Sequence, residues 1–341
     1  MRFIKLSGES GFARGLTLGK MIKDVCVHNL SFLEQKLAEK SLPLEYGLKL
    51  ALENEKVIAK HFPELLEEIR GIAEGAQLPY NLVLLETAFP FTSDASSKCT
   101  IISAFGTITT NGIPIVGRNY DFVLDFKKCN QLRIFRRKDK KFSFVGGTIT
   151  ILGVEEGLNN AGLFVGDAGC EPKELPSSRG LSSRQLMQLV LENCISVDTA
   201  IDFICQAPKF ANNAGTCYLL ADRKETVIIE MGLTRSCLRK SKEGILIASN
   251  TFLTTIAEEM TPSEPTKFNE CDFVRKYLYE KKNKADKKSM RELLSDHSIP
   301  ICAHGEINTL RSVIVKTNER KIMVTDGHPC ISKFEEILIP T

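Results

Sequence analysis

The chain has 341 residues, with 45 Lys and Arg against 42 Asp and Glu, so its formal net charge of +3 is close to neutral. A near-neutral chain without a basic block is not expected to bind nucleic acid or an anionic membrane as its main partner. Hydrophobic residues make up 43% of the chain, which excludes a disordered protein, and the most apolar stretch, Phe144 to Val154, is too short to span a bilayer. We therefore expect a small-molecule substrate, no nucleic acid and no membrane.

The first hundred residues predict helices. After a short first strand, apolar residues recur at helical spacing among charged ones. Pro63 is placed to begin one of these helices, and the glycines of Gly71 to Gly75 are expected to weaken its far end. The small polar run from Phe91 to Lys98 is typical of an exposed loop. We therefore place a boundary after Lys98, with a helical segment at 1–98 and a second unit at 99–341.

From Cys99 on, the pattern is that of strands. Two runs, Thr100 to Thr109 and Ile113 to Tyr120, flank Asn111-Gly112, a dipeptide that favours a two-residue hairpin turn. Further strands are expected at 131–135, 143–152, 163–166, 216–221, 226–231, 245–249, 309–315 and 321–324. Helices are expected in two pairs, at 182–194 with 197–205 and at 267–279 with 289–294. This order predicts an α+β fold in which two antiparallel sheets pack together and are covered by helices.

The cysteines and the first residues predict the compartment. Met1 to Gly8 has no continuous apolar stretch, so we expect no secretory signal. The eleven cysteines are an odd number and form no CxxC pair, unlike a disulfide framework. We therefore predict a cytoplasmic protein with reduced thiols, one of which can serve as a nucleophile.

The hairpin brings three chemically useful side chains towards one place. Pairing about Asn111-Gly112 puts Asp121 opposite Ile102 and Leu124 opposite Cys99. The end of the second strand, from Arg118 to Asp121, then returns to the neighbourhood of the cysteine. A guanidinium, a carboxylate and a thiol are expected to converge there, and an ordinary surface Arg-Asp pair beside a structural cysteine is the alternative.

Several motifs in this order resemble the acyl-coenzyme A:6-aminopenicillanic acid acyltransferase family of N-terminal nucleophile cysteine hydrolases. The motifs are Cys99 to Ser103, Gly117 to Phe122, Gly157 to Leu163, Ile247 to Phe252, Ile301 to His304 and Asp326 to Cys330, and upstream Gly8 to Gly19 and Glu67 to Gly75 resemble the propeptide of that family. The chain is more distantly similar to choloylglycine hydrolases, penicillin V acylase and acid ceramidases. The resemblance implies a four-layer αββα sandwich with a helical propeptide.

The resemblance also implies that the precursor cuts itself between Lys98 and Cys99. This gives an α chain of residues 1–98 and a catalytic β chain of residues 99–341. A free α-amino group, with a pKa of about 8, can accept the proton of its own thiol, whereas the amide nitrogen of the uncut chain cannot. An amidohydrolase or acyltransferase that uses a Cys99 acyl-enzyme, and an inactive precursor, are therefore expected. Lys98 departs from the family, in which a small or acidic residue usually precedes the cut.

The family's functional residues carry over to several positions. Arg118 and Asp121 match residues that hold the sulfur and the amine, and Asn250 matches the asparagine of the oxyanion hole. Arg311 and Arg275 are alternative candidates for a second basic residue, and Asn159 is a further candidate for substrate binding.

Three other hypotheses stay beside this one. Cys302-x-His304 and His328-x-Cys330 offer the ligand types of a zinc site, but their spacing does not favour one, and we predict no metal. A papain-like protease requires its cysteine on a helix, whereas Cys99 is expected on a strand. The glycines form no nucleotide-binding motif, so no cofactor is expected. An uncut, catalytically silent member that acts as a binding or structural protein is the alternative to the enzyme. Hydrolase against transferase, the acyl group and a homo-oligomer are all left open.

Overall fold

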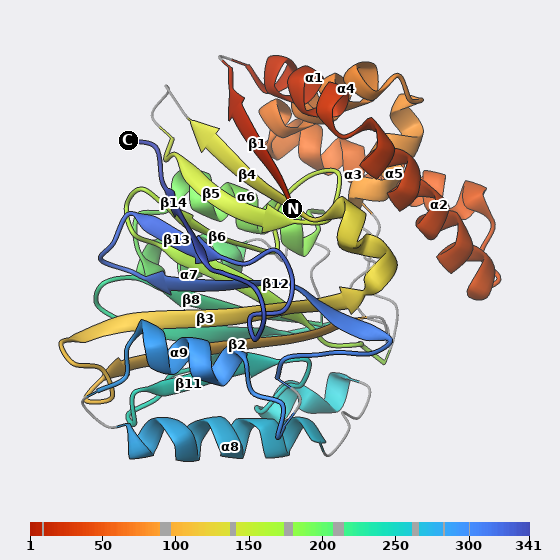
Figure 1. Cartoon of the computed structure of the whole chain (residues 1–341). Helices are drawn as coiled ribbons and strands as arrows, with labels where there is room; N and C mark the ends of the chain where they lie inside the picture. Colours follow the sequence, from red (N-terminus) through yellow and green to blue (C-terminus); the bar gives the residue numbers. More distant parts are fainter. Residues whose placement is uncertain are drawn as a thin grey trace.

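Two sheets pack face to face and carry helices on both outer faces in the computed structural model (Figure 1). The structure describes residues 1–8, 10–88, 97–136, 141–173, 180–206, 215–260, 266–281, 284–299 and 301–341. The larger sheet has eight strands in the order β1 (Arg2–Ser7), β4 (Gln131–Arg136), β5 (Phe144–Thr148), β6 (Glu156–Asn159), β7 (Phe164–Gly169), β8 (Thr216–Ala221), β9 (Thr226–Met231) and β10 (Ser236–Arg239). The smaller sheet has six strands in the order β11 (Ile245–Ser249), β2 (Ser97–Gly106), β3 (Gly112–Val123), β12 (Ile307–Lys316), β13 (Lys321–Val324) and β14 (Glu335–Leu338).

The layers explain why several strands are apolar on both faces. β8, β9 and β11 are buried at every position, because one face meets the other sheet and the opposite face meets helices. The sheets approach closely at β7, where a Cβ atom on Gly166 would lie 3.4 Å from the Ile101 side chain of β2. The four helices of the outer layers are α6 (Ser183–Asn193) and α7 (Val197–Gln206) on the larger sheet, and α8 (Thr266–Glu280) and α9 (Lys287–Leu294) on the smaller one. The predicted αββα sandwich is confirmed.

The N-terminal helices lie at one end of the sandwich, at the upper right in Figure 1. They are α1 (Gly11–Met21), α2 (Lys23–Glu39), α3 (Leu44–His61), α4 (Pro63–Ala76) and α5 (Tyr80–Ala88). This segment also supplies β1, which pairs in parallel with β4 at the edge of the larger sheet. The described residues before Cys99 thus supply β1 to the larger sheet and the first two residues of β2 to the smaller one, in addition to a helical layer.

Glycines allow α1 and α4 to pack with their backbones in contact. A Cβ atom on Gly15 would lie 2.0 Å from the carbonyl oxygen of Glu68, and one on Gly71 would lie 2.2 Å from that of Phe12. Contacts of this length exclude any side chain there. The expectation that Gly71 to Gly75 weakens the end of this helix was wrong, because α4 continues to Ala76 and uses both glycines for packing.

The hairpin of β2 and β3 exists, but its predicted turn and register were wrong. The strands pair up to Gly106 and Gly112, so residues 107–111 connect them in place of a two-residue turn. Gly106 has a positive φ of 59°, and the register shifts beside it. In consequence Cys99 lies opposite Tyr120 and Lys98 lies opposite Asp121. Short strands β6, β10 and β14 and the 3-10 helices Leu124–Cys129 and Thr255–Glu259 were not predicted.

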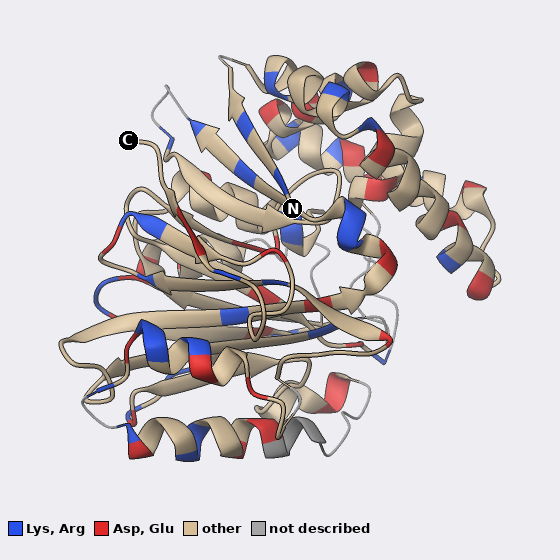
Figure 2. Ribbon diagram, viewed as in Figure 1, with Lys and Arg blue, Asp and Glu red and all other residues tan. Residues whose placement is uncertain are grey.

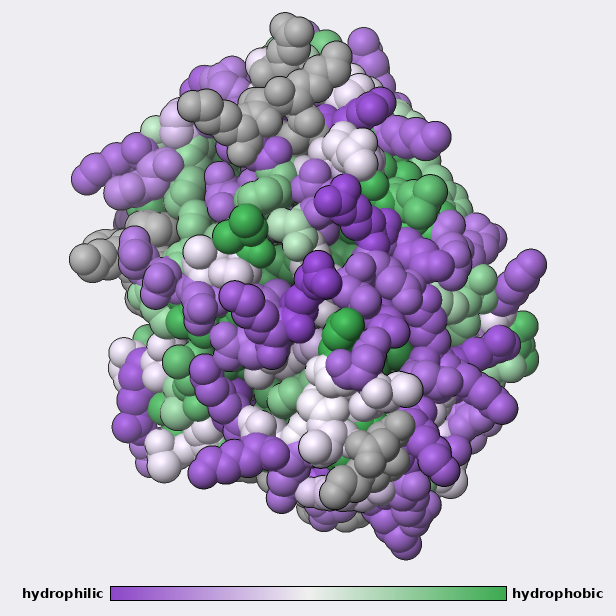
Figure 3. Space-filling view, turned by 90° about the vertical axis from the view of Figure 1, so that its left-hand side faces the viewer, coloured by the Kyte–Doolittle hydropathy of each residue, from purple (hydrophilic) through white to green (hydrophobic). Residues whose placement is uncertain are grey.

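The surface of the described residues mixes both charges. Figure 2 shows blue and red residues interspersed along α8 and α9. Figure 3 shows one face on which polar residues are interrupted by small apolar areas. None of the described helices combines the length and apolar character that a membrane crossing requires.

Candidate functional site

Cys99 lies near the start of β2, between the neighbouring strands β3 and β11. The side chain of Lys98 is exposed, whereas Cys99 is only 4% exposed, because successive residues of a strand point to opposite faces. The Cys99 backbone N–H donates a 2.7 Å hydrogen bond to Oδ1 of Asn250, which directly follows β11. Asn250 Nδ2 donates in turn to the Gly169 carbonyl at 2.6 Å. The nitrogen of the Lys98–Cys99 peptide bond is therefore held by a side chain of the smaller sheet that is anchored to the larger one.

Arg118 shares the inner face of the smaller sheet with Cys99. It lies opposite Ile101 on β3, and its Nη2 lies 3.6 Å from Cys99 Sγ. The same guanidinium donates to the Asp167 carboxylate at 3.1 Å and to the Glu155 carbonyl at 2.6 Å. The guanidinium is thus fixed between the two sheets and points at the sulfur.

Asp121 lies opposite Lys98 in the ladder, so its side chain starts from the other face of the sheet. Its Oδ1 accepts a 2.6 Å hydrogen bond from the Thr309 hydroxyl. The expected convergence of guanidinium, carboxylate and thiol therefore takes a different form. The guanidinium lies beside the sulfur, whereas Asp121 lies opposite Lys98 and its carboxylate binds Thr309.

Buried carboxylates that the sequence analysis did not single out complete this region. Glu156 on β6 ion-pairs with both Arg118 and Arg311, and Glu155 ion-pairs with Arg311 and Arg184. Adjacent acidic residues within an otherwise apolar run were the available signal, since charged residues are seldom fully buried without a partner. Gly147 makes room for this group, because a Cβ atom there would lie 1.9 Å from Glu156 Oε1.

The charges around the thiol nearly balance. In the described region, ion pairs link the guanidiniums of Arg118, Arg184 and Arg311 to the carboxylates of Glu155, Glu156 and Asp167. Burial raises the pKa of Asp167 to about 6, so this group is still mostly ionised at neutral pH.

Burial likewise raises the pKa of the Cys99 thiol to about 11, with Arg118 opposing the shift. The uncut chain therefore holds a neutral thiol at pH 7. Burial is the main cause of this neutral state, and the negative charges of Asp167 and Asp121 add to it, whereas Arg118 favours the thiolate.

The remaining predicted site residues separate into two groups. Arg311 is fully buried, and its guanidinium lies 4.4 Å from the ring centre of Tyr120, the residue opposite Cys99. Arg275 is 42% exposed on α8 and pairs with Asp272, so the structure places it in the outer layer and not between the sheets with the thiol. Of the two alternatives for a second basic residue, the geometry favours Arg311.

Asn159 makes its recorded hydrogen bonds with the backbone. Its Nδ2 donates to the carbonyls of Leu191 and Cys194, and its Oδ1 accepts from the N–H groups of Ala161 and Leu163. This buried amide ties the turn after β6 to the end of α6. These contacts indicate a structural role, and substrate binding by Asn159 stays a prediction.

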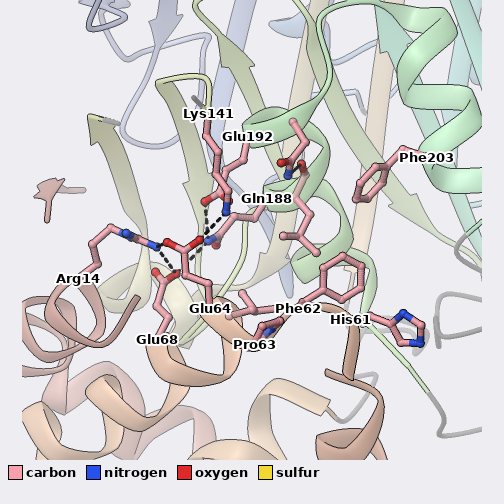
Figure 4. Close-up of a pocket in the computed structure, with 13 residues that line it drawn as sticks. Arg14, His61, Phe62, Pro63, Glu64, Glu68, Lys141, Gln188, Glu192 and Phe203 are labelled. Carbon is pink, nitrogen blue, oxygen red and sulfur yellow. Dashed lines mark hydrogen bonds and ion pairs between the residues drawn. The ribbon is translucent and has the colours of Figure 1, made fainter. Parts of the chain in front are cut away.

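A cavity between the N-terminal helices and α6 has a different character (Figure 4). Glu64 on α4 accepts hydrogen bonds from Arg14 at 2.6 Å and from Lys141 at 2.7 Å. Lys141 also pairs with Glu192 of α6 at 3.3 Å. Cys99 is not among the residues that line this cavity. The ion pairs of this cavity join Glu64, which precedes the predicted cut, to Lys141, which follows it.

Comparisons with known proteins identify the family of the chain. The model of the family described as acyl-coenzyme A:6-aminopenicillanic acid acyl-transferase matches residues 108–329, well over half of the chain. The matched segment contains Arg118, Asp121 and Asn250 and begins downstream of Cys99. No curated protein sequence matches the chain significantly.

Solved structures show a related fold. A Caenorhabditis elegans N-acylethanolamine-hydrolyzing acid amidase ortholog is similar with a TM-score of 0.50 and 17% identity, over 71% of this chain and 100% of the other. A mutant conjugated bile acid hydrolase from Clostridium perfringens gives a TM-score of 0.48 at 14% identity, over 70% and 92% of the two chains. Penicillin V acylase from Agrobacterium tumefaciens gives 0.44 at 13% identity, over 67% and 83%.

Proposed function

Because this chain belongs to the acyl-coenzyme A:6-aminopenicillanic acid acyltransferase family, we propose that it is a self-processing cysteine amidohydrolase or acyltransferase. In this proposal Cys99 becomes the N-terminal nucleophile of a catalytic chain, residues 99–341, after cleavage of the Lys98–Cys99 bond. The observation that carries the proposal is the environment of that one peptide bond. Arg118 lies 3.6 Å from the sulfur, and Asn250 holds the nitrogen that would become the free amine.

The cleavage step uses only groups of this chain and water. Cys99 Sγ attacks the carbonyl carbon of Lys98, and the thiol proton passes to the departing nitrogen as the carbon–nitrogen bond breaks. The product is a thioester between the Lys98 carbonyl and Cys99 Sγ, with a free amine on Cys99. Water then hydrolyses the thioester and leaves a carboxylate on Lys98. Asn250 and the strand pairing of Lys98 with Asp121 orient the bond for this attack.

The mature enzyme reuses the same groups. The Cys99 amine accepts the thiol proton, the sulfur attacks the carbonyl of an N-acyl amide or acyl thioester, and Asn250 with backbone N–H groups stabilises the oxyanion. The charged form of the sulfur is favoured by Arg118. Water or an amine then takes the acyl group, so hydrolysis and transfer share one acyl-enzyme.

Intact-mass spectrometry of the purified protein tests this proposal. Wild-type protein should give two fragments, 1–98 and 99–341, whose masses sum to that of the precursor plus one water. Cys99→Ala should give one uncut chain. Cys26→Ala removes another buried thiol, from α2, and serves as the matched control that should still cut.

The mature wild-type protein should in addition form an acyl adduct on residues 99–341 when it is given a reactive N-acyl amide or thioester. Cleavage of Cys99→Ala at the wild-type rate would refute the proposal. A stable, uncut wild-type chain would instead favour the silent binding or structural protein.

A further inference from the structure

Four side chains gather at one end of the hairpin formed by β12 and β13. The sulfur atoms of Cys302 and Cys330 and a ring nitrogen from each of His297 and His304 all lie within 4.8 Å of one another. His297, Cys302 and His304 precede β12, and Cys330 follows β13. The cluster therefore joins the chain that enters the hairpin to the chain that leaves it.

The distances among Cys302, Cys330 and His304 match those of a tetrahedral metal site, and His297 completes the set of four within 4.8 Å. The two sulfurs are 3.7 Å apart, and His304 Nε2 lies 3.4 Å from each of them. Zinc binds sulfur at about 2.3 Å and imidazole nitrogen at about 2.0–2.1 Å, so tetrahedral angles separate two sulfurs by about 3.8 Å and a sulfur from a nitrogen by about 3.5 Å. A disulfide bond, at about 2.05 Å, is far shorter than the observed sulfur separation.

Backbone turns hold these ligands in place. The Asp296 carboxylate accepts from the N–H groups of Ser298 at 2.9 Å and Ile299 at 3.2 Å, and the Asp296 carbonyl accepts from Cys302 at 3.1 Å. On the other side, the Ser332 N–H closes a turn onto the His328 carbonyl at 2.9 Å. Hydrogen-bonded turns that begin at Asp296 and at His328 therefore hold the backbone on both sides of the cluster.

We propose that His297, Cys302, His304 and Cys330 form a structural zinc site. Two thiolates and two imidazoles are a soft donor set that selects Zn²⁺ over Mg²⁺ or Ca²⁺. Four protein ligands fill a tetrahedral shell and leave no position for a substrate, so the site is structural and not catalytic. The His328-x-Cys330 spacing offered His328 as the fourth ligand. In the structure the fourth ligand is His297, and the His328 ring stacks on the His304 ring with 3.9 Å between their centres.

The zinc would fix β12 beside the proposed catalytic strands. The Ala303 N–H donates to the Thr309 hydroxyl at 3.0 Å, and that hydroxyl donates to Asp121. The loop that carries two of the ligands therefore leads directly to the partner of Asp121. Loss of the metal should loosen this hairpin and lower the thermal stability of the chain.

Metal analysis of the full chain tests the site. After reduction, stripping with a chelator and dialysis against zinc, the wild type should retain about one zinc ion per chain. Cys330→Ser, at a partly exposed position, and Cys302→Ser should both lose it. Cys205→Ser removes an exposed thiol outside the cluster and should keep the zinc.

Two further measurements separate binding from misfolding. Zinc should raise the melting temperature of the wild type and not that of Cys330→Ser, and Co²⁺ should give the visible bands of a tetrahedral thiolate complex only in the wild type and Cys205→Ser. Cys99→Ala should bind zinc normally, so this proposal can fail or succeed independently of self-cleavage. Failure of the reduced wild type to retain zinc, or equal retention by Cys330→Ser, would overturn the assignment.

Discussion

Glu156 is a buried carboxylate that pairs with two guanidiniums in the region around Cys99. It is fully buried, as are its partners Arg118 and Arg311. Oε1 accepts from Arg311 Nε at 2.5 Å, and Oε2 accepts from Arg311 Nη2 at 3.1 Å and from Arg118 Nη1. Glu156→Gln keeps the volume of the side chain but replaces one acceptor oxygen with a donor NH₂ group.

The magnitude follows from this geometry. If Gln keeps the bond to Arg311 Nε, its NH₂ group faces N–H donors of both guanidiniums, so two charge-assisted hydrogen bonds are lost at about 1.5–3 kcal/mol each. Breaking a buried ion pair costs about 3–5 kcal/mol in general, which agrees with this sum. An unfolding entropy of about 2.1 cal/mol/K per residue, over 341 residues, converts 3–5 kcal/mol into a melting temperature lower by roughly 4–7 °C.

Thermal unfolding followed by circular dichroism measures the effect. The variant should be made in the Cys99→Ala background, so that every sample is one uncut chain. Glu64→Gln is the control, because Glu64 has a side chain that is 36% exposed and pairs of this kind contribute about 0–1 kcal/mol. If Glu156→Gln has the same melting temperature as the Glu64→Gln control, the buried ion pairs of Glu156 do not contribute to the stability of the packed sheets as argued.

Three further outcomes are expected. Gly15→Ala should lower the urea midpoint, at a cost of about 1–3 kcal/mol, because the added Cβ meets backbone atoms. Gly47→Ala meets only the methyl ends of the Leu85 and Leu37 side chains and should be close to neutral; equal effects of the two substitutions would contradict the close helix packing. Burial raises the pKa of Glu64, but hydrogen bonds from Lys141 and Arg14 outweigh burial and lower this pKa from the ordinary 4.5 to about 2. In the cleaved protein the pairing of Glu64 with Lys141 therefore stabilises the assembly above pH 4.5, and its contribution is lost as the pH falls towards 2. Because this partly exposed pair contributes only about 0–1 kcal/mol, size-exclusion chromatography should show the two chains of Lys141→Ala separating at a slightly higher pH than those of the wild type; superimposable profiles would exclude the contribution of this pair. Asp121→Asn removes the negative charge opposite Lys98 and should slow self-cleavage roughly tenfold, which corresponds to about 1.4 kcal/mol of lost transition-state stabilisation. A gel time course showing the wild-type rate would remove Asp121 from the proposed mechanism.

The sequence by itself determined the layers and the outline of the site. Apolar runs of strand length, interrupted by two pairs of amphipathic helices, are local patterns, and they predicted two packed sheets covered by helices, while the family resemblance implied the αββα sandwich that the structure confirms. The Cys99 and Arg118 motifs lie on adjacent strands of one hairpin, so a short stretch of chain was enough to bring them together.

Only the tertiary structure decided which residues surround the thiol. The register of β2 and β3 depends on how the connecting loop leaves Gly106, and a small shift moves Asp121 from one partner to another and decides which face it takes. Glu156 and Asp167 lie on the neighbouring strands β6 and β7, whereas Arg311 lies far along the chain on β12, and no local pattern shows that these charges meet between two sheets.

The cluster of His297, Cys302, His304 and Cys330 gives the same lesson for a metal site. Its ligand spacing along the chain is uninformative, because the β12–β13 hairpin lies between the two groups of ligands. When the β12–β13 hairpin folds, it brings Cys330 next to the three ligands that precede β12. Local side-chain patterns therefore specified the elements, whereas charge pairing and ligand geometry arose from packing between distant elements.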